Sequence, residues 1–508
     1  MPSARLSFDP AFAVGVIDRR LFGSFVEHLG RAVYDGIYEP GHPLADADGF
    51  RTDVIDLVQE LGVSTIRYPG GNFVSAYRWE DGVGPRERRP VRLDLAWHST
   101  ETNQIGLDEF ATWAEKAGSD VMMAVNLGTR GVQEALDLLE YCSIRSGTEL
   151  SDRRIANGAP EPYRFRMWCL GNEMDGPWQV GHRSADDYGK LASQTAKAMK
   201  QLDRDIELVV CGSSSSRMPT FGAWERTVLE HTFDDVEMIS CHAYYELAGD
   251  LPSFLASGVD MDRFIEAVVA TADHVAAVRQ SEKRIDVSFD EWNVWYNERF
   301  ETVDKITGID EWPVAPRLLE DVYTVADAVV VGALLISLLK HADRVRSASL
   351  AQLVNVIAPI MTEPGGAAWR QTTFFPFAIT SRLARGVALR VRIDAPTVPT
   401  ARFGAVPRID AVATYDGEAG LAAAFLVNRS VDEETSVVID LTAFEDAQVA
   451  EALTLGGHDP GACNTLDEPD RVTPFANSTA AIVDGRLEIV LPPVSWTAIS
   501  LTVTSPSL

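Results

Sequence analysis

Two glutamates with similar surroundings are the residues of this sequence best suited to chemistry. Glu173 follows the apolar run 165–170 and the pair Gly171-Asn172, and Glu291 follows the apolar run 285–289. A carboxylate at the mouth of a buried strand costs free energy unless it has a partner or a task. Either glutamate alone is equally well explained by an ordinary salt bridge. Two of them at the carboxyl edge of one sheet have the arrangement that glycoside hydrolysis needs, with one acid and one nucleophile.

Alternation along the strand supports this pairing. Side chains two residues apart point to the same face of a strand. Val287, Phe289 and Glu291 are therefore expected to share one face, and Cys169 is expected to share a face with Glu173. We expect both of these faces to point inward, which would bring the two carboxyl groups together.

The other predicted strand ends are rich in groups that hydrogen-bond sugar hydroxyls in a shaped pocket. They carry Glu27, His28, Arg67, Asn72, Asn126, Asn172, His242, Tyr244, Asp290, Asn293, Gln352 and Asn355. Either Arg67 or Tyr244 is able to stabilise the anion of a nucleophile. Trp97, Trp178, Trp292 and Trp295 offer apolar faces for sugar rings, although each tryptophan alone is more simply a core residue.

The elements that must position these residues alternate between strands and helices. Apolar strand patterns occupy residues 21–27, 64–69, 121–127, 165–173, 208–213, 238–244, 285–291 and 348–354. Helical periodicity marks residues 52–61, 107–116, 132–142, 185–202, 224–231, 261–279 and 325–341. Eight such strands predict an α/β fold with a (β/α)₈ TIM barrel, whose active site lies at the carboxyl ends of the strands. An open doubly wound sheet is the alternative, but no G-x-G-x-x-G follows the first strand.

After residue 385 the pattern changes to short alternating segments. These are residues 411–414, 421–427, 436–441, 452–455, 487–491 and 495–503, and turn signals separate several of them. The pattern predicts a C-terminal antiparallel β-sandwich. Residues 1–16 indicate a lone strand with no local partner, which we expect the sandwich to include. The predicted domains are thus a catalytic barrel of residues 17–384 and a β-sandwich domain of residues 1–16 plus 385–508.

Composition and motif content narrow the function classes. With 45 basic and 74 acidic residues the net charge is −29, which argues against binding to nucleic acid or an anionic membrane. No apolar run reaches transmembrane length, and no secretory signal is visible at the start. Five widely spaced cysteines are typical of reduced thiols in a cytoplasmic protein. Neither G-x-S-x-G nor H-E-x-x-H is present, and His28 and His242 are better explained as polar pocket residues than as metal ligands.

Several longer motifs carry a family resemblance. They are Glu27-His28, Arg67-Tyr68-Pro69-Gly70-Gly71-Asn72-Phe73, Arg78-Trp79, Gly171-Asn172-Glu173-Met174-Asp175-Gly176-Pro177-Trp178 and Asp290-Glu291-Trp292-Asn293-Val294-Trp295-Tyr296. In this order they resemble the α-L-arabinofuranosidases of glycoside hydrolase family 51, from about residue 5 to the carboxyl terminus. The resemblance implies a clan A barrel with a β-sandwich and retaining hydrolysis. It also implies that no metal or organic cofactor is needed.

The resemblance assigns roles to individual residues. It implies Glu173 as general acid/base, Glu291 as nucleophile and Asn172 as a contact of the sugar 2-hydroxyl. The positions around the furanose ring that match the family are Glu27, Arg67, Asn72, Tyr244 and Gln352, and those near the leaving group are Trp97 and Trp178. The loop of residues 306–316 matches less closely, which leaves the leaving-group preference open. Members of the family commonly form hexamers, so a homo-oligomer is expected.

The expected function is that of a retaining, exo-acting α-L-arabinofuranosidase in the cytoplasm. It would hydrolyse terminal non-reducing α-L-arabinofuranosyl residues from arabinan or arabinoxylan oligosaccharides by double displacement. Another clan A retaining glycosidase, such as a β-xylosidase or endoglucanase, is the alternative enzyme. A non-catalytic sugar-binding protein is the remaining alternative, but such a protein would not need both glutamates.

Overall fold

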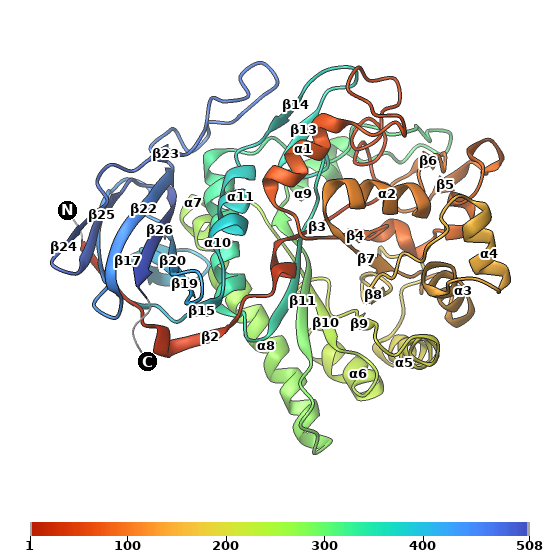
Figure 1. Ribbon diagram of the computed structural model, residues 1–508, viewed down its shortest axis with the longest axis horizontal. Helices are drawn as coiled ribbons and strands as arrows, with labels where there is room; N and C mark the ends of the chain where they lie inside the picture. The colour runs from red at the N-terminus through yellow and green to blue at the C-terminus, as the bar shows by residue number, and fades with distance from the viewer. Residues whose placement is uncertain (1–2, 505–508) are drawn as a thin grey trace.

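Eight parallel strands close into a barrel in the computed structural model, which describes residues 3–504 (Figure 1). Around the barrel the order is β10-β11-β12-β3-β4-β7-β8-β9, so strands that are neighbours in sequence are also neighbours in space. Their bounds are β3 Gly23–Phe25, β4 Thr65–Tyr68, β7 Asp120–Ala124, β8 Met167–Leu170, β9 Glu207–Val210, β10 Met238–Tyr245, β11 Asp286–Val294 and β12 Val345–Leu350. All eight predicted strands are present, and closure confirms the barrel over the open sheet.

Most of the helices cover the outside of the barrel. The helices are α1 Thr52–Leu61, α2 Leu107–Ala117, α3 Val132–Ser143, α4 Glu149–Ala156, α5 Ala185–Leu202, α6 Ala223–Thr232, α7 Leu251–Leu255, α8 Ser257–Val278, α9 Asn297–Arg299, α10 Val325–Lys340 and α11 Phe374–Leu383. Their ends follow local signals. The Ser184 side chain caps α5 by accepting from the Asp187 N–H, and α1 stops at Gly62, whose φ is 76°.

The second domain is a sandwich of two sheets, with strand orders β16-β1-β21-β25-β24 and β2-β15-β19-β20-β26-β22-β23. The bounds are β1 Ser3–Ser7, β2 Ala13–Val16, β15 Val387–Leu389, β16 Arg392–Asp394, β19 Ile409–Asp416, β20 Leu421–Asn428, β21 Thr435–Asp440, β22 Glu445–Leu455, β23 Phe475–Ala476, β24 Ala481–Val483, β25 Arg486–Leu491 and β26 Ser495–Thr504. The pairing is antiparallel except between β1 and β21, which are parallel. The predicted C-terminal β-sandwich is therefore present.

The amino-terminal segment contributes two strands rather than the single one expected. β1 lies between β16 and β21 in one sheet, and β2 pairs with β15 at the edge of the other. The first and last described residues, Ser3 and Thr504, therefore both lie in the sandwich, at the left of Figure 1. This pairing supports our proposal that residues 1–16 and 385–508 form one domain and residues 17–384 the barrel domain.

Helix α10 joins the two domains. Nearly every one of its side chains is buried, because it packs on the barrel and α8 on one side and on β19, β20 and β26 of the sandwich on the other. Trp496 of β26 belongs to the same apolar core as the barrel helices. Among residues 3–504, no helix has the length and apolar character needed to cross a membrane.

Three hairpins extend from this frame. β5 Arg92–Asp94 pairs with β6 Ser99–Glu101, and β13 Ile360–Thr362 pairs with β14 Ala368–Arg370. The third hairpin, β17 Thr397–Thr400 with β18 Gly404–Pro407, belongs to the carboxyl-terminal part of the chain but contacts α7 of the barrel. The turns of the first and third hairpins line a pocket that is described in the next subsection.

Candidate active site

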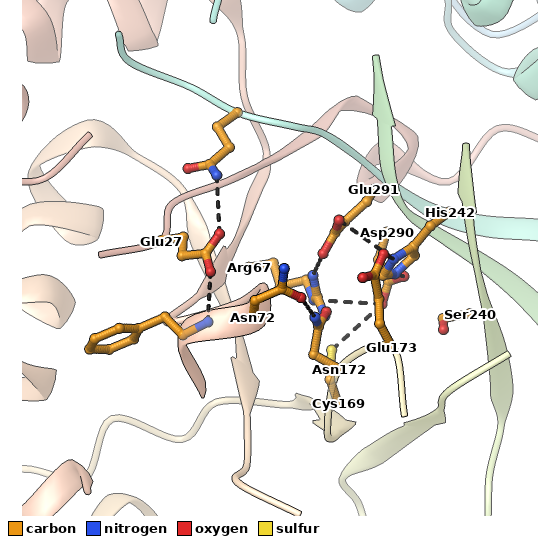
Figure 2. Close-up of polar contacts among 12 residues, drawn as sticks. Glu27, Arg67, Asn72, Cys169, Asn172, Glu173, Ser240, His242, Asp290 and Glu291 are labelled. Carbon is orange, nitrogen blue, oxygen red and sulfur yellow. Dashed lines mark hydrogen bonds and ion pairs between the residues drawn. The ribbon is translucent and has the colours of Figure 1, made fainter. Parts of the chain in front are cut away.

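The two predicted catalytic glutamates converge at the carboxyl end of the barrel (Figure 2). Glu173 lies just beyond the end of β8, in a turn where its φ is 42°. Glu291 lies within β11, which continues to Val294 rather than ending at the glutamate as the sequence indicated. One carboxylate oxygen of Glu173 and one of Glu291 lie within 4.8 Å of each other. Two buried carboxyl groups at this distance repel each other when both are charged.

A β-bulge, rather than simple alternation, points Glu291 into the site. Phe289 belongs to the outer core and packs edge-on against Phe264 of α8, with ring centroids 5.8 Å apart, so its face of β11 points outward. The register between β11 and β12 shifts between Phe289 and Trp292. Because of this shift Asp290 and Glu291 both reach the interior. The prediction that Val287, Phe289 and Glu291 share an inward face was wrong for this reason.

Each glutamate has a different set of hydrogen-bond donors. Glu291 Oε1 accepts from Arg67 Nη1 at 2.7 Å, and its Oε2 accepts from the Tyr244 hydroxyl at 2.7 Å. Glu173 Oε2 accepts from Trp178 Nε1 at 2.7 Å, and its Oε1 lies 2.8 Å from His242 Nδ1. The donors around Glu291 therefore include a permanent cation, which favours its carboxylate form.

His242 lies between the two glutamates. Its Nδ1 is 3.5 Å from Glu291 Oε2 as well as 2.8 Å from Glu173, and its Nε2 is 3.0 Å from Asp290 Oδ1. Burial lowers the pKa of His242, but Glu291, Asp290 and Glu173 together raise it to about 10. At neutral pH the ring is therefore an imidazolium that donates from both nitrogens.

Arg67 lies beneath the pocket and contacts Glu291, Asn172 and Asp290. It bonds Glu291 through Nη1 and the Asn172 side-chain oxygen through Nη2 at 2.7 Å, and its Nε lies 3.7 Å from Asp290 Oδ2. Asn172 in turn donates to Asn72 Oδ1 at 3.2 Å. Burial raises the pKa of Glu291 above its ordinary value, whereas the His242 and Arg67 cations oppose the rise.

Glu27 lies on the other side of Arg67 from the catalytic pair (Figure 2). It accepts from the Phe73 backbone N–H at 2.7 Å, from Trp97 Nε1 at 2.8 Å and from Gln352 Nε2 at 3.2 Å. Burial raises the pKa of Glu27 to about 8, although the Phe73 and Trp97 donors oppose this. Near neutral pH Glu27 is therefore able to hold a proton and donate it in a hydrogen bond to a sugar hydroxyl.

A pocket of about 460 Å³ opens above these groups. Of the predicted site residues, those that line it are Glu27, Asn72, Trp97, Glu173, Trp178, Tyr244, Glu291 and Gln352. Arg67, Asn172 and His242 lie buried beneath and act on the lining residues rather than forming the wall. The structure thus brings together His242 and the residues to which the family resemblance assigned roles.

Other candidates have structural contacts instead. Trp292, predicted as a possible sugar platform, is fully buried and stacks on Phe377 of α11. Asn126 bonds Thr129 and the Tyr77 backbone carbonyl. Trp292 is wrong as a sugar platform because it follows the bulge and points outward, and the amide of Asn126 is already occupied in a turn.

Sequence reasoning missed one residue of this region and the main contact of another. Asp290 was among the polar residues predicted at the strand ends, but nothing in the sequence indicated that it would lie 3.0 Å from His242 Nε2. Arg402, on the third hairpin, lines the pocket from the carboxyl-terminal part of the chain. No local pattern marks Arg402 or the contact between Asp290 and His242, since both depend on how distant segments pack.

Glu173, His242 and Glu291 also carry atoms of the kinds that bind metal ions, gathered within 4.8 Å of one another. However, Arg67, Tyr244 and Trp178 already bind the oxygens of the two carboxylates. An ion here would have to displace these hydrogen bonds. The expectation that the site works without a metal remains a prediction.

Known proteins resemble this chain over nearly its whole length. The alpha-L-arabinofuranosidase 1 domain matches residues 57–252, and the alpha-L-arabinofuranosidase C-terminal domain matches residues 290–495. An exo-alpha-(1->6)-L-arabinofuranosidase of Bifidobacterium longum is 59% identical, over 98% of this chain and 97% of that protein. An intracellular exo-alpha-(1->5)-L-arabinofuranosidase of Streptomyces lividans is 57% identical, over 100% of this chain and 76% of that protein.

Solved structures agree in fold. A family 51 alpha-L-arabinofuranosidase from Bifidobacterium longum has a TM-score of 0.95 and 50% identity, and the match covers 98% of this chain and 99% of that one. The Thermotoga maritima alpha-L-arabinofuranosidase in its arabinose complex has a TM-score of 0.86 and 32% identity, with 98% and 99% covered. With two arabinofuranosidase domain matches, end-to-end relatives and this shared fold, the chain belongs to the α-L-arabinofuranosidases of glycoside hydrolase family 51.

Proposed function

We propose that the protein is a retaining, exo-acting α-L-arabinofuranosidase that releases terminal non-reducing arabinofuranosyl residues from arabinan or arabinoxylan oligosaccharides. The observation that carries this proposal is the pair of carboxylate oxygens of Glu173 and Glu291 within 4.8 Å. Retaining glycosidases hold their two carboxyl groups about 5–5.5 Å apart, whereas inverting enzymes need about 6.5–9.5 Å to admit a water molecule. Two relatives are named exo-acting L-arabinofuranosidases, which supports both arabinofuranose as the released sugar and hydrolysis from the end of the chain.

In the first step Glu291 attacks the anomeric carbon while Glu173 protonates the departing oxygen. The donors Arg67 and Tyr244 hold the Glu291 carboxylate in place and favour its charged form. Glu173 accepts from Trp178 and His242, which fix its carboxyl group at the side of the pocket where the leaving group must lie. The bond from the anomeric carbon to the leaving oxygen breaks as the glycosyl-enzyme ester forms.

In the second step water hydrolyses this ester. Glu173, now a carboxylate, accepts a proton from the water molecule as it attacks the anomeric carbon, and Glu291 departs as a carboxylate. The permanent cation Arg67 stabilises the charge that returns to Glu291. Two displacements restore the original anomeric configuration. The sugar product is arabinose, whose anomeric carbon carries a hydroxyl group from water in place of the leaving group.

Azide rescue separates the two roles. Glu173→Ala keeps the nucleophile and should still form the ester from a dinitrophenyl arabinofuranoside, because that leaving group needs little acid assistance. It should then stall, and added azide should release an arabinosyl azide of retained configuration. Glu291→Ala forms no ester, and azide entering its space should give the inverted azide. Reversal of these two products, determined by proton NMR, would show that the roles have been exchanged.

We also propose a cytoplasmic location and a homo-oligomer. Relatives from Streptomyces lividans and Halalkalibacterium halodurans are named intracellular arabinofuranosidases, which supports the location. Activity recovered mainly from the medium of intact cells would contradict it. The resemblance to a family that commonly forms hexamers supports the assembly. Light scattering on the purified protein gives its mass, and a monomer of 55.6 kDa would overturn this part of the proposal.

A further inference from the structure

The outer part of the pocket on the Glu173 side is the place for the leaving group. A general acid must face the oxygen that it protonates, so the leaving sugar lies beyond Glu173 and Trp178. Besides the glutamates already described, the charged residues of the pocket lining are Arg217, Glu246, Glu301, Lys305 and Arg402. Arg217 comes from the loop after β9, Glu246 follows β10, and Arg402 comes from the β17–β18 hairpin.

One backbone hydrogen bond and one cation–π contact between the two domains hold the hairpin of Arg402 at the pocket. Its backbone N–H donates to the hydroxyl of Ser253, a buried residue of α7, at 3.1 Å. The next residue, Phe403, lies under the guanidinium group of Arg263 at 5.9 Å. The hairpin is therefore anchored on the barrel while the Arg402 side chain remains exposed at the pocket mouth.

The loop that carries Arg217 is also restrained by hydrogen bonds. Ser214 donates to Asp175 Oδ2 from its backbone at 3.0 Å and from its hydroxyl at 3.1 Å. The Arg217 backbone N–H then donates to the Ser215 hydroxyl at 3.2 Å. These bonds restrain the backbone but leave the guanidinium group exposed to the pocket.

Within residues 3–504, no carboxylate forms an ion pair with the guanidinium group of Arg217 or Arg402. By contrast Lys305, another cation of the lining, pairs with Glu301 at 2.8 Å. Apart from Glu27 and the catalytic pair, the remaining charged residues of the lining are Glu246 and the two arginines, which leaves one positive charge in excess. The whole chain has a net charge of −29, which repels anions. An excess of positive charge at the pocket is therefore not expected by chance.

We propose that Arg217 and Arg402 form a leaving-group subsite that binds the carboxylate of an acidic sugar. A guanidinium group presents a planar fork of N–H donors that matches a carboxylate, and two such groups would hold a uronic acid in the leaving position. This inference rests on the proposed function and specifies its substrate. The preferred substrates are arabinofuranosyl groups attached to a uronic acid, which ordinary hydrolysis converts to free arabinose and the acidic sugar.

The test compares two synthetic disaccharides that differ only in charge. In one, α-L-arabinofuranose is attached to a hexuronic acid, and in the other to the methyl ester of the same sugar. We expect the wild-type enzyme to hydrolyse the acid with a kcat/KM about tenfold higher than the ester. Arg217→Gln and Arg402→Gln should each reduce this preference, mainly through KM, and the double variant should abolish it.

Controls separate this inference from the proposed function. The preference is a ratio measured within each variant, so partial loss of folded enzyme cancels. Arg226→Gln is the matched control, since Arg226 is an exposed arginine of α6 that pairs with Glu230 and does not line the pocket. An equal rate on acid and ester in the wild type, or a preference that survives in the double variant, overturns the subsite. Failure to hydrolyse a nitrophenyl arabinofuranoside would instead overturn the proposed function.

Discussion

Replacing His242 by glutamine tests how the charges of the site are balanced. With a pKa of about 10, the ring keeps its positive charge through neutral pH. Glutamine keeps an N–H donor near the same place but removes the charge. The cation favours the carboxylate form of Glu291, so its loss makes Glu291 take up a proton at higher pH. Because Glu291 must be ionised to attack, the acidic limb of the activity profile should move to higher pH.

The size of the movement follows from the distance. His242 Nδ1 lies 3.5 Å from Glu291 Oε2. At an effective dielectric constant of about 20, two unit charges at this distance interact by about 4–5 kcal/mol, or about 3 pKa units. Arg67 remains in the variant, and water that enters the space left by the ring screens part of the lost interaction. We therefore expect the acidic limb to rise by about 1–3 pH units.

The assay is the pH profile of kcat/KM with a nitrophenyl arabinofuranoside. His28→Gln is a matched control, because His28 is also buried against a carboxylate but pairs with Glu101 rather than with the catalytic residues. Its acidic limb should stay within about 0.5 pH units of the wild type. An acidic limb in His242→Gln that does not move, or that moves to lower pH, would refute the reasoning.

Three further substitutions have expected outcomes. Asp410→Asn removes the buried carboxylate that pairs with both Lys340 and Arg429 at the domain junction, and because Arg429 is itself buried, its uncompensated charge should cost about 3–5 kcal/mol in urea denaturation. Gly332→Ala places a Cβ 2.2 Å from the Trp496 ring between α10 and the sandwich, and should lower stability in the same assay by about 1–3 kcal/mol. Trp178→Phe removes the indole N–H that donates to the candidate acid. It should lower kcat/KM by about tenfold or more on natural oligosaccharides, and less on dinitrophenyl substrates, as measured by initial rates.

Much of the barrel follows from periodicity in the sequence. Helices α1 and α5 have the predicted ends, because one face of each is apolar and the other faces solvent. Helix α11 was missed because Pro376 and neighbouring aromatic and β-branched residues hide its period, and most of its side chains are buried. Periodicity detects a helix only when its two faces differ in polarity.

The site was predictable in its members but not in its geometry. Glu173 and Glu291 stand out from their motifs, whereas the inward position of Glu291 beside Asp290 depends on a bulge in β11. A bulge arises from how a strand pairs with its neighbour, so a two-residue alternation cannot show it. Arg402 reaches the pocket only because a hairpin of a later segment docks on α7. That contact depends on tertiary packing.

The position of β1 affects how the protein is made. This strand is made before the other described strands, yet its partners β16 and β21 come after the whole barrel in the sequence. At about 5–20 residues per second, translation needs roughly 20–90 s to supply β21. Until β16 and then β21 have been made, the two edges of β1 lack their final partners. The barrel segments emerge during this time and are free to fold. The sandwich can therefore close only after β26 has been made, so ribosome-bound chains should acquire a protease-resistant barrel before β1 becomes protected.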